Sequence, residues 1–169
     1  MYRPIPLALA CLTLVLATVR AGAEDVPKFS DYPVTIFAGK PVKPRFHTQN
    51  LRDRRELYQH AASEEKVNAG GRFIVVKLPC GSACAQPTFL DVTNGKIIEF
   101  DTVSGWREVP DDFEPVLSRA GSRLVVFSGT RNETGVNGLH FYTIGDNGKL
   151  KHLRTVDVDG NFERAPKIQ

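Results

Sequence analysis

The chain has 169 residues, and its 22 lysine and arginine residues slightly outnumber its 19 aspartate and glutamate residues. This length suits one domain with a sizeable hydrophobic core and is too short for two. The nearly balanced charge argues against nucleic-acid binding, because proteins that bind nucleic acids carry a sustained basic face. We therefore expect a single domain without a nucleic-acid partner.

The first 23 residues have the organisation of a cleavable secretory signal peptide. Arg3 precedes an uncharged apolar stretch at residues 7–19, and a triplet of small residues at 21–23 ends before Glu24. A basic start, an apolar stretch and an A-x-A cleavage site follow one another in this order in secretory signals. The stretch is shorter than the about 20 residues of a membrane-spanning helix, which makes a permanent anchor the weaker alternative. We expect an exported protein, periplasmic or secreted, with no membrane span after cleavage.

Residues 24–48 contain four prolines and one strand-like run, Val34–Phe37. Because proline cannot donate to a sheet ladder and is confined to edges, we predict an extended lead-in with at most an edge strand. Positive charge gathers at its end and just after it, on Lys40, Lys43, Arg45, Arg52, Arg54 and Arg55. Asp53 and Glu56 interrupt this run, so we interpret it as a solvated, mildly basic face.

One helix is predicted directly after the lead-in. Asn50 belongs to the residue types that cap helix N-termini, and residues 51–62 are largely good helix formers. Leu51, Tyr58 and Ala62 recur at the spacing of one helix face. We expect this helix to lie across a sheet and to bury Leu51 and Tyr58.

Strands and tight turns are predicted for the rest of the chain. The apolar runs are Phe73–Val76, Phe89–Val92, Ile97–Phe100, Leu124–Phe127, Leu139–Ile144 and Leu150–Val156. Asn-Gly turns at 93–96 and 145–149 separate two pairs of these runs, and Asn-Gly supplies the positive φ angles of tight hairpins. We predict a mostly β (α+β) fold, an antiparallel, strongly twisted sheet or small sandwich of about five to seven strands with the helix packed on it. This domain is expected over residues 49–160, followed by a C-terminal tail at 161–169.

Cys80 and Cys84 remain after signal cleavage, whereas Cys11 lies within the expected signal peptide. In an oxidising compartment, an even pair this close in sequence is most simply a disulfide. Two thiols at this spacing also suit redox exchange or Cu(I) binding. However, no methionine remains after cleavage, no histidine lies near the pair, and the spacing is C-x-x-x-C without a βαβ pattern. We predict a structural disulfide, with thiol-disulfide exchange or metal handling as the alternative.

No motif for catalysis, metal or cofactor binding is recognisable, since G-x-S-x-G, H-E-x-x-H, P-loop and G-x-G-x-x-G patterns are all missing. The four histidines are scattered, and we interpret each as a surface or half-buried structural residue. Asp111, Asp112 and Glu114 lie near the single tryptophan, but acids on one short loop seldom face a common ligand. Residues 157–163 follow a calcium loop only in part, so a solvated turn is the preferred interpretation. We expect no catalytic residue, no metal site and no cofactor.

Three short stretches follow the patterns N-x-x-G-x-[FY], C-G-x-x-C and D-x-x-[TN]-G-K. They are Asn68–Phe73, Cys80–Cys84 and Asp91–Lys96. In these stretches, and more loosely over residues 45–155, the chain resembles a family of small exported bacterial proteins of unassigned function. It departs from that pattern where Arg72 replaces a histidine and Leu78-Pro79 replaces Trp-Gly. The resemblance implies an exported, β-rich, disulfide-containing protein and no particular reaction.

We expect a non-catalytic binding module whose ligand is unknown and whose partner is a periplasmic or secreted protein. A three-residue turn held between two cysteines presents backbone N–H groups in a fixed shape, and Gly70-Gly71 lets another chain approach closely. Arg72 follows these glycines, and its guanidinium fork suits a carboxylate or phosphate. The predicted recognition surface consists of Arg72, Gly81, Ser82 and Ala83.

Overall fold

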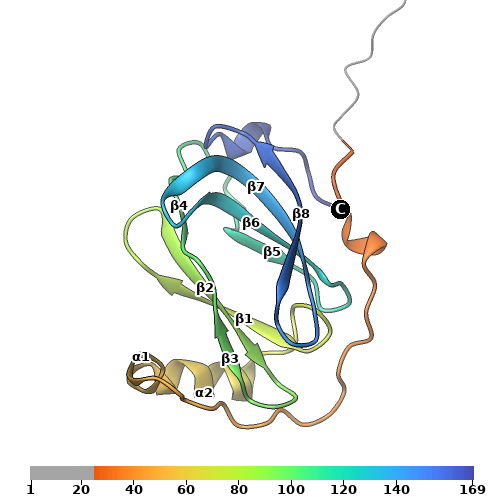
Figure 1. The fold of residues 1–169 in the computed structure, drawn as a ribbon, viewed down its shortest axis with the longest axis vertical. Helices are drawn as coiled ribbons and strands as arrows, with labels where there is room; N and C mark the ends of the chain where they lie inside the picture. The colour runs from red at the N-terminus through yellow and green to blue at the C-terminus, as the bar shows by residue number, and fades with distance from the viewer. Residues whose placement is uncertain (1–24) are drawn as a thin grey trace, which may run out of the picture.

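The structure, a computed structural model, describes residues 25–169. The expected signal peptide and Cys11 lie outside the described residues. The described chain begins with an extended segment, continues through two helices and then forms strands up to a short C-terminal segment (Figure 1). In this part of the chain, no helix is long and apolar enough to cross a membrane.

Eight strands form one antiparallel sheet within the described residues. They are β1 (Phe73–Pro79), β2 (Cys84–Asp91), β3 (Ile97–Glu99), β4 (Val103–Ser104), β5 (Val116–Ser118), β6 (Leu124–Arg131), β7 (Thr134–Ile144) and β8 (Leu150–Asp157). Their order is β1-β2-β4-β6-β7-β8, with β3 paired to β2 and β5 paired to β6. Figure 1 shows β1–β3 on one side of the molecule and β5–β8 on the other. The mostly β, antiparallel class is thereby confirmed.

The strand number predicted from the sequence is too low. The missed strands are short: β4 has two residues and β5 has three. Such lengths are too short to show the alternation of apolar and polar residues that identifies a strand. Both Asn-Gly hairpins are present, with Leu90 opposite Ile97 in the first and Ile144 opposite Leu150 in the second.

The predicted helix is present but divided. The helical elements are α1 (Gln49–Asp53), α2 (Arg55–Glu64) and two short 3-10 helices, η1 (Phe29–Asp31) and η2 (Phe162–Arg164). Arg54 separates α1 from α2, because its φ of −107° and ψ of 20° leave helical geometry. The N-cap of α1 is Thr48 rather than Asn50, and the Thr48 hydroxyl accepts from the backbone N–H of Leu51 at 3.2 Å.

One face of the sheet carries an apolar cluster to which both halves of the strand order contribute. Its aromatic members include Phe73 on β1, Phe89 on β2 and Phe127 on β6, each at most 1% exposed. The ring centroids of Phe89 and Phe127 lie 6.4 Å apart, although β4 separates β2 from β6 in the strand order. The two halves of the sheet therefore share one core.

The helices cover the opposite face of β1 and β2. Leu51, Tyr58 and Ala61 are buried there against Ile74 and Leu90. The prediction that the helical segment lies on a sheet and buries Leu51 and Tyr58 is confirmed. Since its other face contributes to the shared core, β1 is buried on both sides along most of its length.

The segments before and after the sheet also belong to the packed structure. Phe29 of the lead-in and Phe162 of the C-terminal segment are each 6% exposed and pack with Leu124 and Phe141 on the other face of β6 and β7. The backbone N–H of Phe29 donates to the carbonyl of Gln169 at 2.8 Å, so the two segments meet (Figure 1).

From this meeting point the lead-in stays extended and follows the rim of the sheet to α1 (Figure 1). Backbone N–H groups of Val34, Phe37, Val42 and Arg45 donate to the carbonyls of Gly121, Gly71, Val92 and Gly95 at 2.7 to 3.0 Å. Glycine permits this close approach, because a Cβ atom at Gly71 would lie 2.5 Å from the carbonyl oxygen of Thr35. A Cβ atom at Gly95 would lie 2.1 Å from the carbonyl oxygen of Lys43. The lead-in is therefore fixed to the body of the protein without forming a strand.

Candidate functional site

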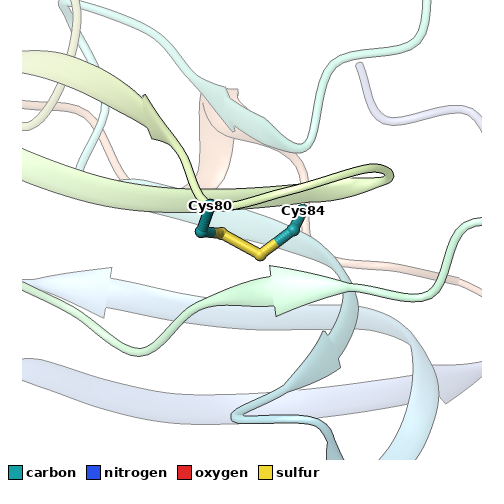
Figure 2. The surroundings of a disulfide bond; sticks show 2 residues. All are labelled: Cys80 and Cys84. Carbon is teal, nitrogen blue, oxygen red and sulfur yellow. A yellow bond between two sulfur atoms is a disulfide. The ribbon is translucent and has the colours of Figure 1, made fainter.

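Cys80 and Cys84 form a disulfide that closes the β1–β2 hairpin (Figure 2). Cys80 directly follows β1, Cys84 is the first residue of β2, and their Cα atoms lie 5.2 Å apart. The loop between them is exposed, and it takes positive φ angles of 132° at Gly81 and 46° at Ala83. The predicted disulfide is thus present, and it closes an exposed turn in which Ala83 takes a positive φ angle that is uncommon for a residue other than glycine.

The cystine loop, residues 80–84, rests against β4. The carbonyl of Ala83 accepts from the backbone N–H of Gly105 at 3.1 Å, and Cys84 pairs with Ser104 in the sheet. Cys80 itself is exposed. The loop is therefore held against the sheet, with Cys80 at the surface and Cys84 partly buried.

Arg72 is engaged within the chain. Its Nε donates to Oδ1 of Asp91 at 3.1 Å and its Nη2 to Oδ2 of Asp91 at 2.8 Å, and Nη2 also contacts the hydroxyl of Thr93. The Asp91 side chain is only 3% exposed, whereas the Arg72 side chain is 24% exposed. The fork that was predicted to hold an acidic or phosphate ligand thus holds a buried carboxylate of the same protein.

Asp91 also organises the turn that follows it. Its carboxylate accepts from the backbone N–H and hydroxyl of Thr93 at 2.9 and 2.7 Å, and from the side-chain amide of Asn94 at 2.8 Å. The stretch Asp91–Lys96, which carries part of the family resemblance, therefore has a structural task in this fold.

The predicted recognition residues do not form one site. Arg72 precedes β1 and the cystine loop follows it, so the seven residues of β1 separate them. At about 3.3 Å per residue, Arg72 and the start of the cystine loop are roughly 25 Å apart. The close approach that Gly71 permits is taken by the protein's own lead-in, through Val34 and Thr35, and Gly70 faces the side chains of Ile144 and Phe73.

A cavity that the sequence did not indicate lies between the loop before β5 and the C-terminal segment. We call it the tail pocket, and its volume is about 540 Å³. Its apolar lining comes from Phe113, Leu117, Leu139 and Phe162, joined by parts of residues 165–168. Asp112, Glu114, Glu163 and Lys167 add charged groups to the lining. The pocket thus combines an apolar surface with three carboxylates and one ammonium group.

A row of aromatic rings supports one wall of the tail pocket. The ring centroid of Phe113 lies 5.3 Å from that of Trp106 and 5.2 Å from that of Phe162. Nε1 of Trp106 donates to the carbonyl of Ser128 at 2.7 Å, which anchors the row to β6. Sequence reasoning noticed the acids near Trp106 but did not expect them to meet Phe162, because that residue lies about 50 positions later in what was predicted to be a tail.

The acids near Trp106 have different surroundings. Asp112 and Glu114 line the tail pocket, whereas Asp111 is not part of its lining. Glu114 forms an ion pair with Lys77 on β1. Asp112 and Glu163 are exposed at the pocket. These two carboxylates are therefore placed to meet a ligand.

His140 on β7 is buried and structural. Its Nε2 faces two backbone carbonyl oxygens, at 2.8 Å for Gly129 and 3.1 Å for Val136, so this nitrogen carries the proton. Its Nδ1 then accepts from the hydroxyl of Thr155 at 3.2 Å, and that hydroxyl oxygen also contacts Nε2 of His152 at 2.9 Å. Burial lowers the pKa of His140 below its usual value.

In the turn at residues 157–163 the side-chain oxygens of Asp157, Asp159 and Asn161 are engaged within the protein, whereas the Glu163 carboxylate is exposed at the tail pocket. Oδ1 of Asp157 accepts from the backbone N–H of Asp159, and Asp159 pairs with Arg107 at 2.7 Å. The side-chain oxygen of Asn161 accepts from the backbone of Arg164 in η2. Within residues 25–169, no group of three or more His, Cys, Asp or Glu residues is placed to hold a metal ion.

No protein-family model, no curated protein and no solved structure matches this chain. The family resemblance noted in the sequence therefore stays a prediction.

Proposed function

We propose that this protein is an exported, non-catalytic binding module that takes its ligand in the tail pocket. The observation that carries this proposal is the cavity itself. Its volume of about 540 Å³ falls within the size range of small-molecule sites, and its lining combines apolar surface with a few polar groups, as such sites do. Export follows from the predicted signal peptide, and the module would act in the periplasm or outside the cell.

The lining defines the chemistry of the ligand. Phe113 and Phe162 offer aromatic surface, while Asp112 and Glu163 offer exposed carboxylates. Glu114 is paired with Lys77, which reduces its part in binding. The exposed carboxylates of Asp112 and Glu163 outnumber the single ammonium group of Lys167. A ligand with an apolar or aromatic body and a positively charged end is therefore complementary to the lining, whether it is a small molecule or a side chain of a partner protein.

Trp106 supplies a direct readout, because it is the single tryptophan and its ring packs on Phe113 in the pocket wall. We would titrate the protein with phenethylammonium, 2-phenylethanol and phenylacetate, which share one ring and differ in charge, and follow the fluorescence of Trp106. The cation should bind tightest and the anion weakest. Binding of phenylacetate as tight as that of phenethylammonium would contradict the role of the carboxylates, and no response to any of the three would contradict the pocket.

Variants locate the binding. Asp112→Asn and Glu163→Gln should each weaken phenethylammonium binding by about two- to fivefold, the range of exposed ion pairs, and leave 2-phenylethanol binding unchanged. Glu133→Gln is the matched control, because Glu133 is an exposed acid at the tip of the β6–β7 hairpin and does not line the pocket.

Thiol-disulfide exchange at Cys80 and Cys84 is a second candidate, favoured by the exposure of Cys80. A partner thiolate would attack one sulfur of the disulfide, form a mixed disulfide and release the other cysteine as a thiolate. Equilibration with glutathione buffers of known potential tests this function. A pair that stays oxidised against the glutathione pool is structural, whereas a pair that is reduced easily supports exchange.

A further inference from the structure

The lead-in exposes apolar side chains in a short stretch. Six large hydrophobic side chains are exposed in the described chain, and three of them, Ile36, Phe37 and Val42, lie within seven residues. They are 48%, 36% and 38% exposed, respectively. Single exposed hydrophobic residues need no explanation, but a contiguous group of them marks a contact surface.

This exposure is built into the fold. The backbone on both sides of the exposed side chains is fixed by the hydrogen bonds from Val34, Phe37, Val42 and Arg45 to the body of the protein. The apolar surface also continues inward, into a groove of about 470 Å³ between the lead-in and the end of α2. Pro41, Val67, Ile74 and Val92 are part of that groove's lining. Binding at this strip would therefore require little ordering of the chain.

Positive charge accompanies the apolar side chains. Lys40, Lys43 and Arg45 are exposed within the same strip, and no carboxylate occurs in the sequence between Asp31 and Asp53. The turn that carries Lys96 is held next to Arg45, because the backbone N–H of Arg45 donates to Gly95 at 2.7 Å. Glu65 and Lys66 at the groove carry opposite charges, so they do not change this balance.

We propose that this strip, which we call the lead-in surface (Ile36, Phe37, Lys40, Val42, Lys43 and Arg45), binds the surface of an anionic phospholipid bilayer. Apolar side chains that enter the boundary of the acyl chains, flanked by basic side chains at the headgroups, are the arrangement of proteins that lie on a membrane without crossing it. An acidic protein would match the basic residues but would leave Ile36, Phe37 and Val42 without a reason to be exposed together. The bilayer accounts for both features.

The test is flotation of the protein, prepared without residues 1–23 so that the apolar stretch of the signal peptide takes no part. The vesicles contain either phosphatidylcholine alone or an equimolar mixture of phosphatidylcholine and phosphatidylglycerol. The protein should float with the mixed vesicles, remain in solution with phosphatidylcholine alone, and be partly released as the salt concentration rises. No binding to the mixed vesicles at low salt would overturn the proposal.

Two sets of variants separate the apolar and the ionic contributions. The double variant Ile36→Ser/Phe37→Ser should lower the partition coefficient by about tenfold, and Lys43→Gln and Arg45→Gln by roughly fivefold each. The matched controls are Val136→Ser, at an exposed valine on β7, and Lys151→Gln, at an exposed lysine on β8, and neither should change binding. All substituted side chains are exposed, and unchanged thermal unfolding would show that the fold is kept.

Two results would reject the bilayer as the occupant. If the serine double variant binds the mixed vesicles as tightly as the wild type, the apolar side chains do not enter the membrane. Soluble poly-glutamate provides the second result. If it displaces the protein from the vesicles, binds the protein as tightly as the vesicles do, and binds Lys43→Gln as much more weakly as the vesicles do, the surface recognises acidic chains rather than lipid. The tail pocket takes no part in these measurements. The outcome of the vesicle experiments therefore leaves the ligand proposal for the tail pocket unaffected.

Discussion

The two ends of β1 are held in different ways. At one end, Cys80 and Cys84 are joined covalently in an exposed loop. At the other end, Arg72 and Asp91 are joined by an ion pair whose carboxylate is buried. Both connections lie between β1 and β2, so they can be compared directly.

The comparison predicts that the ion pair, rather than the covalent bond, is the stronger support here. The disulfide closes a loop of only five residues, and the chain-entropy model gives about 2 kcal/mol for so short a loop. The carboxylate of Asp91 has given up water, and it is balanced by Arg72, Thr93 and Asn94. Removing a partner of a buried pair leaves a charge without compensation, which costs about 3 to 5 kcal/mol.

The largest expected effect is that of Arg72→Ala. It should lower the free energy of unfolding by about 3 kcal/mol, the lower end for buried pairs, because Arg72 is itself partly exposed. Urea unfolding with linear extrapolation measures the change. This outcome differs from the expectation for a free recognition residue, whose removal would leave stability unchanged.

Two further variants sharpen the result for Arg72. Arg72→Lys keeps the charge but lacks the fork, so its stability should fall between those of the wild type and Arg72→Ala. Arg52→Ala, at an exposed arginine of α1, should change stability by no more than about 0.5 kcal/mol. If Arg72→Ala is as stable as Arg52→Ala, the bonds from Thr93 and Asn94 are enough to hold the Asp91 carboxylate.

A smaller effect is expected at the other end of β1. Cys80→Ser should lower the free energy of unfolding by about 2 kcal/mol or less, because only the short loop gains freedom in the unfolded chain. The midpoint of urea unfolding should shift in a single transition. Failure of the variant to fold would show that the disulfide supports more than its own loop. Reduction of the wild-type protein with dithiothreitol provides a check that substitutes no residue.

The sequence predicted the elements that rest on local chemistry. The Asn-Gly turns, the apolar runs and the burial of Leu51 and Tyr58 follow from rules that involve only neighbouring residues. It missed β4 and β5, which exist only because longer strands pair with them. It also placed the start of the helix at Asn50, although the Thr48 hydroxyl two residues earlier provides the cap.

The candidate sites show the same limit more clearly. The disulfide was predictable because its two cysteines are close in sequence. The pairing of Arg72 with Asp91 was not, because the two residues become neighbours only through the register that places Phe73 opposite Asp91. The tail pocket was also beyond sequence reasoning, since its walls come from residues about 50 positions apart that meet only in the folded chain.

His140 extends the comparison to a titrating side chain in the other half of the sheet, on β7. Its Nε2 donates to the carbonyl of Gly129 on β6. The backbone of Gly129 lies close to β4, because a Cβ atom at Gly129 would lie 2.7 Å from the carbonyl oxygen of Ser104. Ser104 in turn pairs with Cys84 on β2. Burial is the largest cause that lowers the pKa of His140, and the charges of Arg131 and His152 act in the same direction. Its bonds to Gly129 and Val136 partly oppose them.

The contribution of His140 to stability should therefore depend on pH. We expect it to be smaller than the effects of Arg72→Ala and Cys80→Ser. The folded protein holds His140 neutral, whereas the unfolded chain takes up a proton at about pH 6.5. Because the pKa is lower in the folded state, the stabilisation is complete above that pH and is lost as the pH falls through the folded-state pKa.

His140→Gln keeps an N–H donor for Gly129 but does not titrate, so its free energy of unfolding should fall less than that of the wild type between pH 7 and pH 5. His60→Gln, at an exposed histidine of α2, should follow the wild type. If the free energy of unfolding falls equally in the wild type and in His140→Gln, protonation of His140 does not destabilise the folded protein.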